Sequence, residues 1–278
     1  MPSADSGKNH EASTCRVTPP CSRPTRRTPG AAGPRDHVPV CAGGATGGFH
    51  VTRRALLAAA LLAVIHDARA EDRVVVADFS SAVAAGETPA GWELNEKSGE
   101  AELAVVKDGG VSAIRLRSVN TSFSIQKEVK VDLERFPVLT WNWKVSKLPV
   151  GGDFRKSATD DQAAQLFVAF SKSKAIVYVW SSTAPKGIMQ STSPAPFMTV
   201  MVVVVRSGPA QAGKWVRESR NVRQDYKKLF GSEPPPVSGM RLQINSQHTG
   251  TSAESYFADV AFVKPGKQRA KAQVPATK

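Results

Sequence analysis

Beyond residue 70 this 278-residue chain has no cysteine and a single histidine, His248. Its three cysteines are Cys15, Cys21 and Cys41. The later part of the chain therefore forms no disulfide, supplies no thiol nucleophile and cannot build a nitrogen and sulfur zinc site, which needs about four ligands. A Ser-His-acid triad would have to use His248, and no Gly-x-Ser-x-Gly elbow is present. Phosphate-binding and dinucleotide-binding glycine motifs are also absent.

The sequence has no apolar run long enough to span a membrane. The run from Ala55 to Ile65 has eleven residues, whereas a spanning helix needs about 20. It follows two arginines and precedes Ala68-Arg69-Ala70, as in an export signal with a small-x-small cleavage site. We therefore predict a Sec or twin-arginine signal peptide over residues 51–70 and a periplasmic or secreted protein without stable membrane insertion. A signal works poorly behind a long polar arm, so we expect residues 1–50 to be a gene-model artefact or a disordered extension.

Acidic residues are fewer than basic ones, at 24 against 37. The positive excess gathers at the ends of the chain, and five basic residues lie within residues 264–278. We predict that this segment is a disordered basic tail. Because residues 71–263 then carry only a small positive excess, the composition does not indicate a nucleic-acid partner.

Most of the remaining sequence has the pattern of short strands separated by turns. From Leu139 to Val145 apolar and polar residues alternate, which indicates a strand with one buried face. The segments Leu166–Phe170, Ile176–Trp180 and Met198–Val205 are almost wholly apolar, as central strands are. An Asp-Gly-Gly turn at residues 108–110 predicts a hairpin. In all, about ten or eleven strands are predicted.

One helix is predicted, over residues 222–230. Asn221 can cap its first turn, and Gly231 can end it in a left-handed conformation. Many short strands with a single short helix favour an all-β fold, a jelly-roll β-sandwich with one short helix near 222–230. We predict one such domain over residues 71–263, a length sufficient for its own core.

Several blocks of this sequence occur together in a known family. They are Leu139-Thr-Trp-Asn-Trp-Lys-Val145, Asp160-Asp-Gln-Ala-Ala-Gln-Leu-Phe-Val-Ala-Phe170, Trp215-Val-Arg-Glu-Ser-Arg-Asn221 and Tyr256-Phe-Ala-Asp-Val260. Over about Val74 to Val263 the chain resembles the exported bacterial family called domain of unknown function 3047 (DUF3047). That resemblance implies export but no established activity. The layout also resembles galactose-binding-like jelly rolls, the fold of many carbohydrate-binding modules, which implies sugar binding.

Carboxylates are the first candidate ligand groups. Asp153, Asp160 and Asp161 lie close in sequence, and oxygen ligands on a loop suit calcium. We therefore predict polar ligand contacts for all three, with calcium at Asp160 and Asp161 as the metal alternative and no other cofactor. The competing interpretation is that they cap turns. The DUF3047 family tends to carry an acidic stretch where this chain has Asn245 to Thr249, so that stretch implies no calcium site.

Aromatic and loop residues complete the predicted site. Tyr178 and Trp180 share one face of a strand, and such a face either packs in the core or stacks on sugar rings as an exposed platform. Of the two, we predict the platform, with Tyr178 and Trp180 as ligand-binding residues. Trp141 and Trp143 are predicted to pack in the core. His248 lies with Gln247 in a polar loop, where both are predicted at the rim of a ligand groove.

Three functions remain open on the sequence. The first is a non-enzymatic β-sandwich that binds a carbohydrate or another polar ligand of the cell envelope. The second is a glycan-active enzyme that uses two carboxylates, although no pair stands out in the sequence. The third is an envelope scaffold or protein-interaction domain, which predicts a flat aromatic patch and no concave site. The sequence leaves the oligomeric state open.

Overall fold

The computed structural model describes residues 72–84, 86–192 and 196–265. The predicted extension over 1–50, the signal peptide over 51–70 and the tail after Pro265 lie outside the described residues. None of the described helices is long and apolar enough to cross a membrane.

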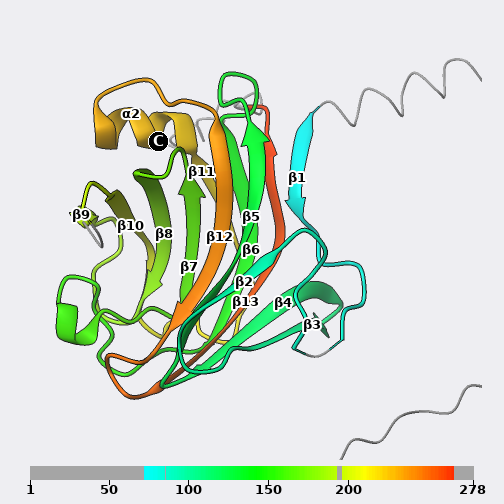
Figure 1. Ribbon diagram of the computed structural model, residues 1–278, viewed down its shortest axis with the longest axis vertical. Helices are drawn as coiled ribbons and strands as arrows, with labels where there is room; N and C mark the ends of the chain where they lie inside the picture. Colours follow the sequence, from blue (N-terminus) through cyan, green and yellow to red (C-terminus); the bar gives the residue numbers. More distant parts are fainter. Residues whose placement is uncertain (1–71, 85, 193–195, 266–278) are drawn as a thin grey trace, which may run out of the picture. The chain divides into compact units, whose positions relative to one another are not determined.

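The described residues fold into two β-sheets packed face to face, with one α-helix at an end of the sandwich (Figure 1). The six-stranded sheet has the order β11-β6-β13-β4-β3, with β1 also paired to β13. Its strands are β1 (Arg73–Ala77), β3 (Glu102–Asp108), β4 (Val111–Val119), β6 (Val138–Lys147), β11 (Val216–Asn221) and β13 (Ser252–Val263). The all-β sandwich predicted from the sequence is confirmed.

The second sheet has seven strands in the order β2-β5-β12-β7-β8-β10-β9. They are β2 (Glu93–Ser98), β5 (Ser122–Val131), β7 (Ala164–Ala169), β8 (Lys174–Ser181), β9 (Met189–Thr192), β10 (Thr199–Ser207) and β12 (Val237–Asn245). Neighbouring strands run antiparallel except β8 and β10, which run parallel because the chain returns through β9 on the outer edge. A short 3₁₀ turn, η1 (Ser157–Thr159), precedes β7.

The core between the sheets is rich in indole rings. Trp141 and Trp143 of β6 are 1% and 0% exposed, which confirms their predicted core position. Across the sandwich, the Trp141 ring lies 5.4 Å from the ring of Tyr178, and the Trp143 ring lies 5.8 Å from that of Trp180. Aromatic pairs at such distances stabilise a core beyond the area they bury.

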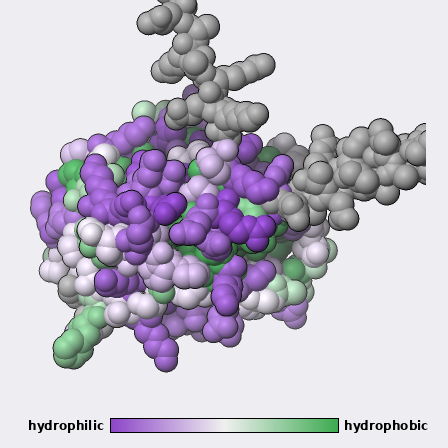
Figure 2. Space-filling view, turned by 90° about the horizontal axis from the view of Figure 1, so that it is seen from above, coloured by the Kyte–Doolittle hydropathy of each residue, from purple (hydrophilic) through white to green (hydrophobic). Residues whose placement is uncertain are grey.

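The predicted helix is confirmed as α2 (Val222–Phe230). The Asn221 side chain accepts a hydrogen bond from the backbone N–H of Gln224, and Gly231 ends the helix at a φ of 70°. Asp225 joins this helix to both sheets, because its carboxylate accepts hydrogen bonds from Tyr178 of β8 and Arg220 of β11. Seen from above relative to Figure 1, the surface is mainly hydrophilic with small apolar areas (Figure 2).

A candidate binding groove on the seven-stranded sheet

The predicted aromatic platform of Tyr178 and Trp180 is wrong. Both side chains point into the core and are 0% and 1% exposed. The Tyr178 hydroxyl donates to Asp225 at 2.8 Å, and the Trp180 indole donates to the Gly208 carbonyl at 3.1 Å. Successive side chains of a strand point to opposite faces of the sheet, so Val177 and Val179 point outward because Tyr178 and Trp180 point into the core. Tyr178 and Trp180 therefore pack in the core, which was the alternative to an exposed platform.

The outward face of the seven-stranded sheet carries a groove of about 560 Å³. Its floor is built from rows of side chains that pair across the strands. The central row, from β2 to β10, consists of Glu93, Gln126, Arg241, Phe167, Val177 and Val202. The row nearer α2 consists of Glu128, Gly239, Ala169, Ala175 and Val200, and the row on the other side includes Gln243, Gln165 and Val179. We call this surface the binding groove.

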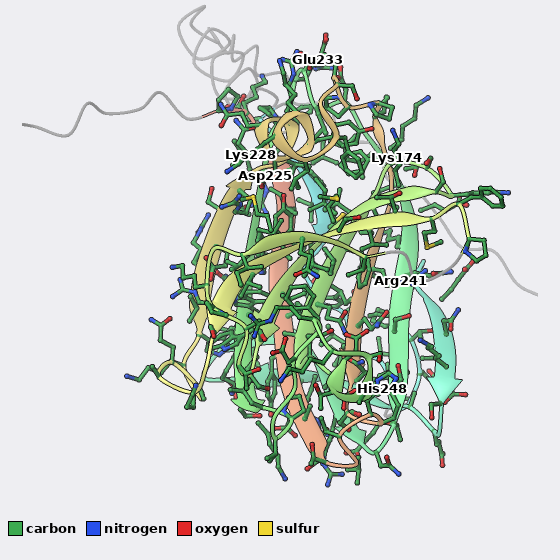
Figure 3. The ribbon with its side chains drawn as sticks, turned by 90° about the vertical axis from the view of Figure 1, so that its left-hand side faces the viewer. Lys174, Asp225, Lys228, Glu233, Arg241 and His248 are labelled. Carbon is green, nitrogen blue, oxygen red and sulfur yellow. The ribbon has the colours of Figure 1, made fainter. Side chains whose placement is uncertain are left out.

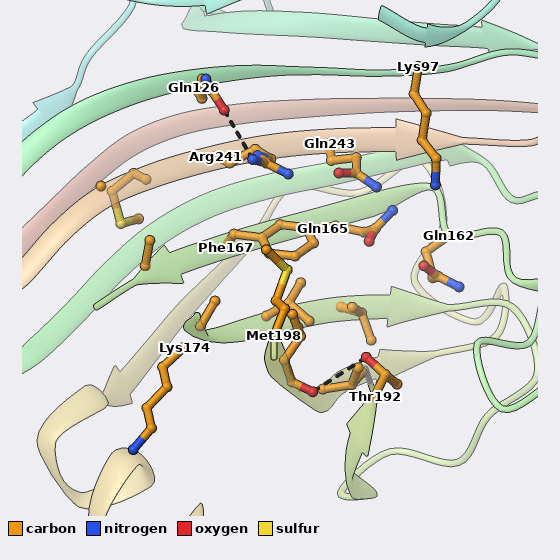
Figure 4. Close-up of a pocket in the computed structure, with 18 of the residues that line it drawn as sticks. Lys97, Gln126, Gln162, Gln165, Phe167, Lys174, Thr192, Met198, Arg241 and Gln243 are labelled. Carbon is orange, nitrogen blue, oxygen red and sulfur yellow. Dashed lines mark hydrogen bonds between the residues drawn. The ribbon is translucent and has the colours of Figure 1, made fainter. Parts of the chain in front are cut away.

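The two halves of the binding groove differ in chemistry. On β5, β12 and β7 the lining is polar and includes the side-chain amides of Gln126, Gln243 and Gln165. On β8 and β10 it is apolar, with valines that pack beneath Phe154 and Met198. Figure 4 shows Gln165, Gln243, Gln162 and Lys97 gathered on one side, with Phe167 and Met198 beside them. A ligand in this groove would therefore meet hydrogen-bonding groups on one flank and an apolar wall on the other.

Arg241 and Phe167 lie at the centre of the floor. Their backbones are direct neighbours on β12 and β7, and the guanidinium carbon lies 5.5 Å from the centre of the phenyl ring. Arg241 donates a hydrogen bond of 3.0 Å to Gln126 Oε1, drawn as a dashed line in Figure 4. Figure 3 places Arg241 between Lys174, near α2, and His248, toward the opposite end of the sheet. Arg241 therefore occupies the middle of the groove along the strands.

At the end far from α2, the structure brings two of the predicted residues into the lining, Asp160 and His248. Burial raises the pKa of the Asp160 carboxyl above its ordinary value, although the hydrogen bond that it accepts from Gln162 at 2.9 Å acts in the opposite direction. His248 Nδ1 lies 3.1 Å from the Asp160 carbonyl oxygen and 3.4 Å from an Asp161 carboxylate oxygen.

Asp161 and Gln247, also predicted to touch ligand, are not part of the groove lining. Asp161 is 0% exposed, and its carboxylate accepts the backbone N–H groups of His248 and Thr249. Asp161 thus holds the loop that carries His248 in place. This is the turn-capping role that the sequence analysis gave as the alternative to ligand binding. The Gln247 side-chain nitrogen lies 3.2 Å from His248 Nδ1, so Gln247 contacts the rim residue from outside the lining.

Asp153 likewise has a local partner. Its carboxylate accepts two hydrogen bonds from the Arg155 guanidinium, at 2.8 and 2.6 Å. These bonds hold the pKa of Asp153 at about 2, below its ordinary value. Its neighbour Phe154, rather than Asp153 itself, lines the groove. Across the three described ranges no group of three or more His, Cys, Asp or Glu side chains is placed to hold a metal ion.

Sequence reasoning missed the central residues Arg241, Phe167, Gln165 and Gln243. The pattern around β12 contains a signal, because Met240, Leu242 and Ile244 alternate with Arg241, Gln243 and Asn245. That alternation indicates an outward polar face, but it does not show that the face is hollowed. The groove appears only when the registers of six strands are combined.

Comparison with known proteins places the chain in a family. The family described as protein of unknown function (DUF3047) matches residues 90–261, and the chain belongs to it. No curated protein matches this sequence. Among solved structures, the chain is similar to the xyloglucanase domain of NopAA from Sinorhizobium fredii, solved with cellobiose, at 8% identity and a TM-score of 0.42, covering 67% of this chain and 100% of that one. It is also similar to the family 30 carbohydrate-binding module of a Clostridium thermocellum cellulase, at 12% identity and a TM-score of 0.38, covering 70% and 98%.

Proposed function

We propose that this protein is a non-enzymatic binding module whose groove on the seven-stranded sheet holds an oligosaccharide or a similar polar polymer of the cell envelope. The observation that carries the proposal is the row of side-chain amides beside Phe167. An amide both donates and accepts hydrogen bonds, as sugar hydroxyl groups do. Few polar groups placed around an apolar surface are typical of small-molecule sites.

The apolar part of the groove fits the same ligand. A sugar ring has an apolar face, which packs on an aromatic ring while its hydroxyl groups reach outward. Phe167 is half-buried and faces the groove at the border between the amides and the valines. We therefore assign Phe167 the stacking role predicted from the sequence for Tyr178 and Trp180. We assign Gln165 and Gln243 the hydrogen bonds to hydroxyl groups. Asp160 and His248 are proposed as contacts at the far end.

The test is a thermal-shift screen of the purified protein against neutral and acidic oligosaccharides, followed by calorimetric titration of each hit. A ligand that binds only the folded state raises the Tm in a dose-dependent way. We expect Phe167→Ala and Gln243→Ala to weaken binding about 10-fold or more while the fold persists. Val119→Ala, an exposed change on the six-stranded sheet, is the matched control and should bind normally. If no saccharide raises the Tm, the proposal fails.

A second function, a glycan-active enzyme, is favoured by one observation. Asp160 lines the groove with a pKa raised by burial, which is the condition of a general acid. The other lining carboxylates are Glu93 of β2 and Glu128 of β5. Release of new reducing ends from a bound oligosaccharide, abolished by Asp160→Asn with binding retained, would establish this function in place of the first.

Calcium is tested in the same screen. Asp161 is fully buried and both of its carboxylate oxygens accept backbone N–H groups, so Asp160, together with carbonyl or amide oxygens, is the more accessible ligand for a calcium ion. A Tm shift with calcium that Asp160→Asn removes would support a calcium site. The scaffold alternative predicts a flat aromatic patch, and the concave groove with buried Tyr178 and Trp180 favours a ligand site instead.

Export of the protein is part of the proposal. The signal pattern over residues 51–70 is expected to direct it to the periplasm or medium. Sequencing the N-terminus of the protein recovered from the cell envelope should read Glu71. A mature protein that retains residues 1–70 would contradict this proposal.

A further inference from the structure

Arg241 differs from the other half-buried arginines of the described chain. Four of them, Arg115, Arg206, Arg220 and Arg223, each pair with a carboxylate within 4 Å. Arg241 has no carboxylate partner at that distance among the described residues. Its side chain is nevertheless held in place, because it donates to Gln126 Oε1 and lies over the Phe167 ring. The structure therefore positions a cation without supplying its counter-ion.

This arrangement is electrostatically incomplete. Burial lowers the pKa of the Arg241 guanidinium, and no neighbouring acid compensates for that effect. A guanidinium has five N–H donors, and Gln126 is the one acceptor recorded for Arg241 within the described ranges. A carboxylate, sulfate or phosphate group could accept two parallel N–H bonds from this fork. The natural place for such an anion is the groove that Arg241 lines.

The remaining charges of the groove act in the same direction. Five basic side chains line it, against three acidic ones. Lys97 projects from β2 toward Gln162 and Gln243 on one side of Arg241, and Lys174 lies toward α2 on the other (Figure 4). The acids lie at the margins, with Glu93 and Glu128 on β2 and β5 and Asp160 at the far end. An elongated anionic ligand would thus find a cation at the centre and one toward each end.

We propose that the ligand of the groove is an acidic saccharide, a sugar chain bearing a carboxylate, sulfate or phosphate group that Arg241 binds through its guanidinium fork. This inference rests on the proposed oligosaccharide function and names the chemical class within it. Gln126 is a positioning residue, since it orients the guanidinium that contacts the anion. Phe167 lies beside the same guanidinium in addition to its proposed contact with the sugar ring.

The experiment compares saccharides that differ in one charge. The full protein is titrated with an oligogalacturonide, with its methyl ester, which has the same chain and no charge, and with sulfated and phosphorylated oligosaccharides of similar length. We expect the acid to bind at least 10-fold more tightly than its ester, and the advantage to fall as salt is raised from 50 to 500 mM. The sulfated and phosphorylated arms identify which anion binds best.

Variants of the arginine then locate the effect. Arg241→Met should lower the affinity for the acidic ligand at least 10-fold more than it lowers the affinity for the neutral ester. Arg241→Lys keeps the charge without the fork and should retain part of the affinity. Arg217→Met removes the same charge from an exposed position on β11 of the other sheet and should change nothing. The Tm of each variant shows that its fold is intact.

The outcomes separate this inference from the proposed function. If the acidic saccharide binds more tightly than its ester and this difference is lost in Arg241→Met, both the saccharide-binding function and the acidic class of ligand are supported. If neutral saccharides bind at the groove as tightly as acidic ones, or if Arg241→Met weakens both equally, the acidic class is overturned and saccharide binding stands. If neither kind binds, both proposals are overturned.

Discussion

At the scale of single residues, the alternation of side chains between the two faces of a strand decides which aromatic rings a ligand can reach. Tyr178 and Trp180 lie inward on β8, and Phe167 lies outward on β7. Trp180→Ala should therefore lower the free energy of unfolding by about 3–5 kcal/mol, the usual cost of removing a buried Trp or Phe. Urea denaturation measures that loss, with Phe167→Ala as the comparison at a half-buried position. A Trp180→Ala protein of unchanged stability would contradict the core position.

A second prediction at this scale concerns acid stability. The pKa of Asp153 is lowered from 3.8 to about 2 by its hydrogen bonds with Arg155. Because the folded-state value is the lower one, the stabilisation is present above pH 4 and is lost as the pH falls toward 2. It amounts to at most about 2 kcal/mol, and to less in salt because Arg155 is partly exposed. Urea denaturation between pH 2 and 5 should show that the free energy of unfolding falls less steeply with decreasing pH in Asp153→Asn than in the wild type. Glu100→Gln, at an exposed position, should follow the wild type.

At the scale of secondary-structure elements, the sequence predicts what local chemistry determines. Helix α2 begins and ends where Asn221 and Gly231 indicate, because capping depends on residues within one turn of the chain. Strands β2 and β9 were not predicted. The first, Glu93–Ser98, is largely polar and exposed, and the second has four residues, so neither has an apolar alternation to detect. They are the two edge strands of the seven-stranded sheet, and each forms by pairing with a single neighbour, β2 with β5 and β9 with β10.

The helix cap allows a direct test. The side chain of Asn221 accepts the Gln224 backbone N–H at 3.0 Å, and alanine cannot replace that acceptor. We expect Asn221→Ala to lower the free energy of unfolding by about 1 kcal/mol. Asn221→Asp keeps the acceptor and places a negative charge at the helix N-terminus, so it should retain stability. Equal losses in the two variants, measured by urea denaturation, would show that the side-chain cap is not the cause.

At the scale of the whole molecule, the sandwich was predictable and the groove was not. Alternating strands with a single helix restrict the fold to few architectures. The groove depends on the lateral order of strands, which sets Arg241 between Gln126, 115 residues earlier, and Phe167 on β7. No spacing along the sequence encodes that neighbourhood. The predicted contacts Asp160 and His248 meet because β7 and β12 are adjacent, and Asp153 stays outside because Arg155 engages it.

The depth of the groove is likewise a property of several strands together. Gly239, Ala169 and Ala175 lie side by side on β12, β7 and β8. Because glycine has no side chain and alanine has only a methyl group, the groove is deeper along the row nearer α2. Ala175 is half-buried against the outward apolar cluster of Phe154 and the valines, so Ala175→Leu would fill this hollow away from the core between the sheets. We expect the free energy of unfolding to stay within about 1 kcal/mol of the wild type and the affinity for a groove ligand to fall about 10-fold.

Val119→Leu is the matched control for that variant, because it enlarges an exposed side chain on the six-stranded sheet. Calorimetric titration of both variants with the same oligosaccharide measures the difference, and urea denaturation confirms their folds. Loss of affinity confined to Ala175→Leu would mean that the ligand extends along the groove as far as the α2 end. Unchanged affinity would restrict the ligand to the part lined by Arg241, Gln243 and Asp160, since the volume near α2 would then be unoccupied.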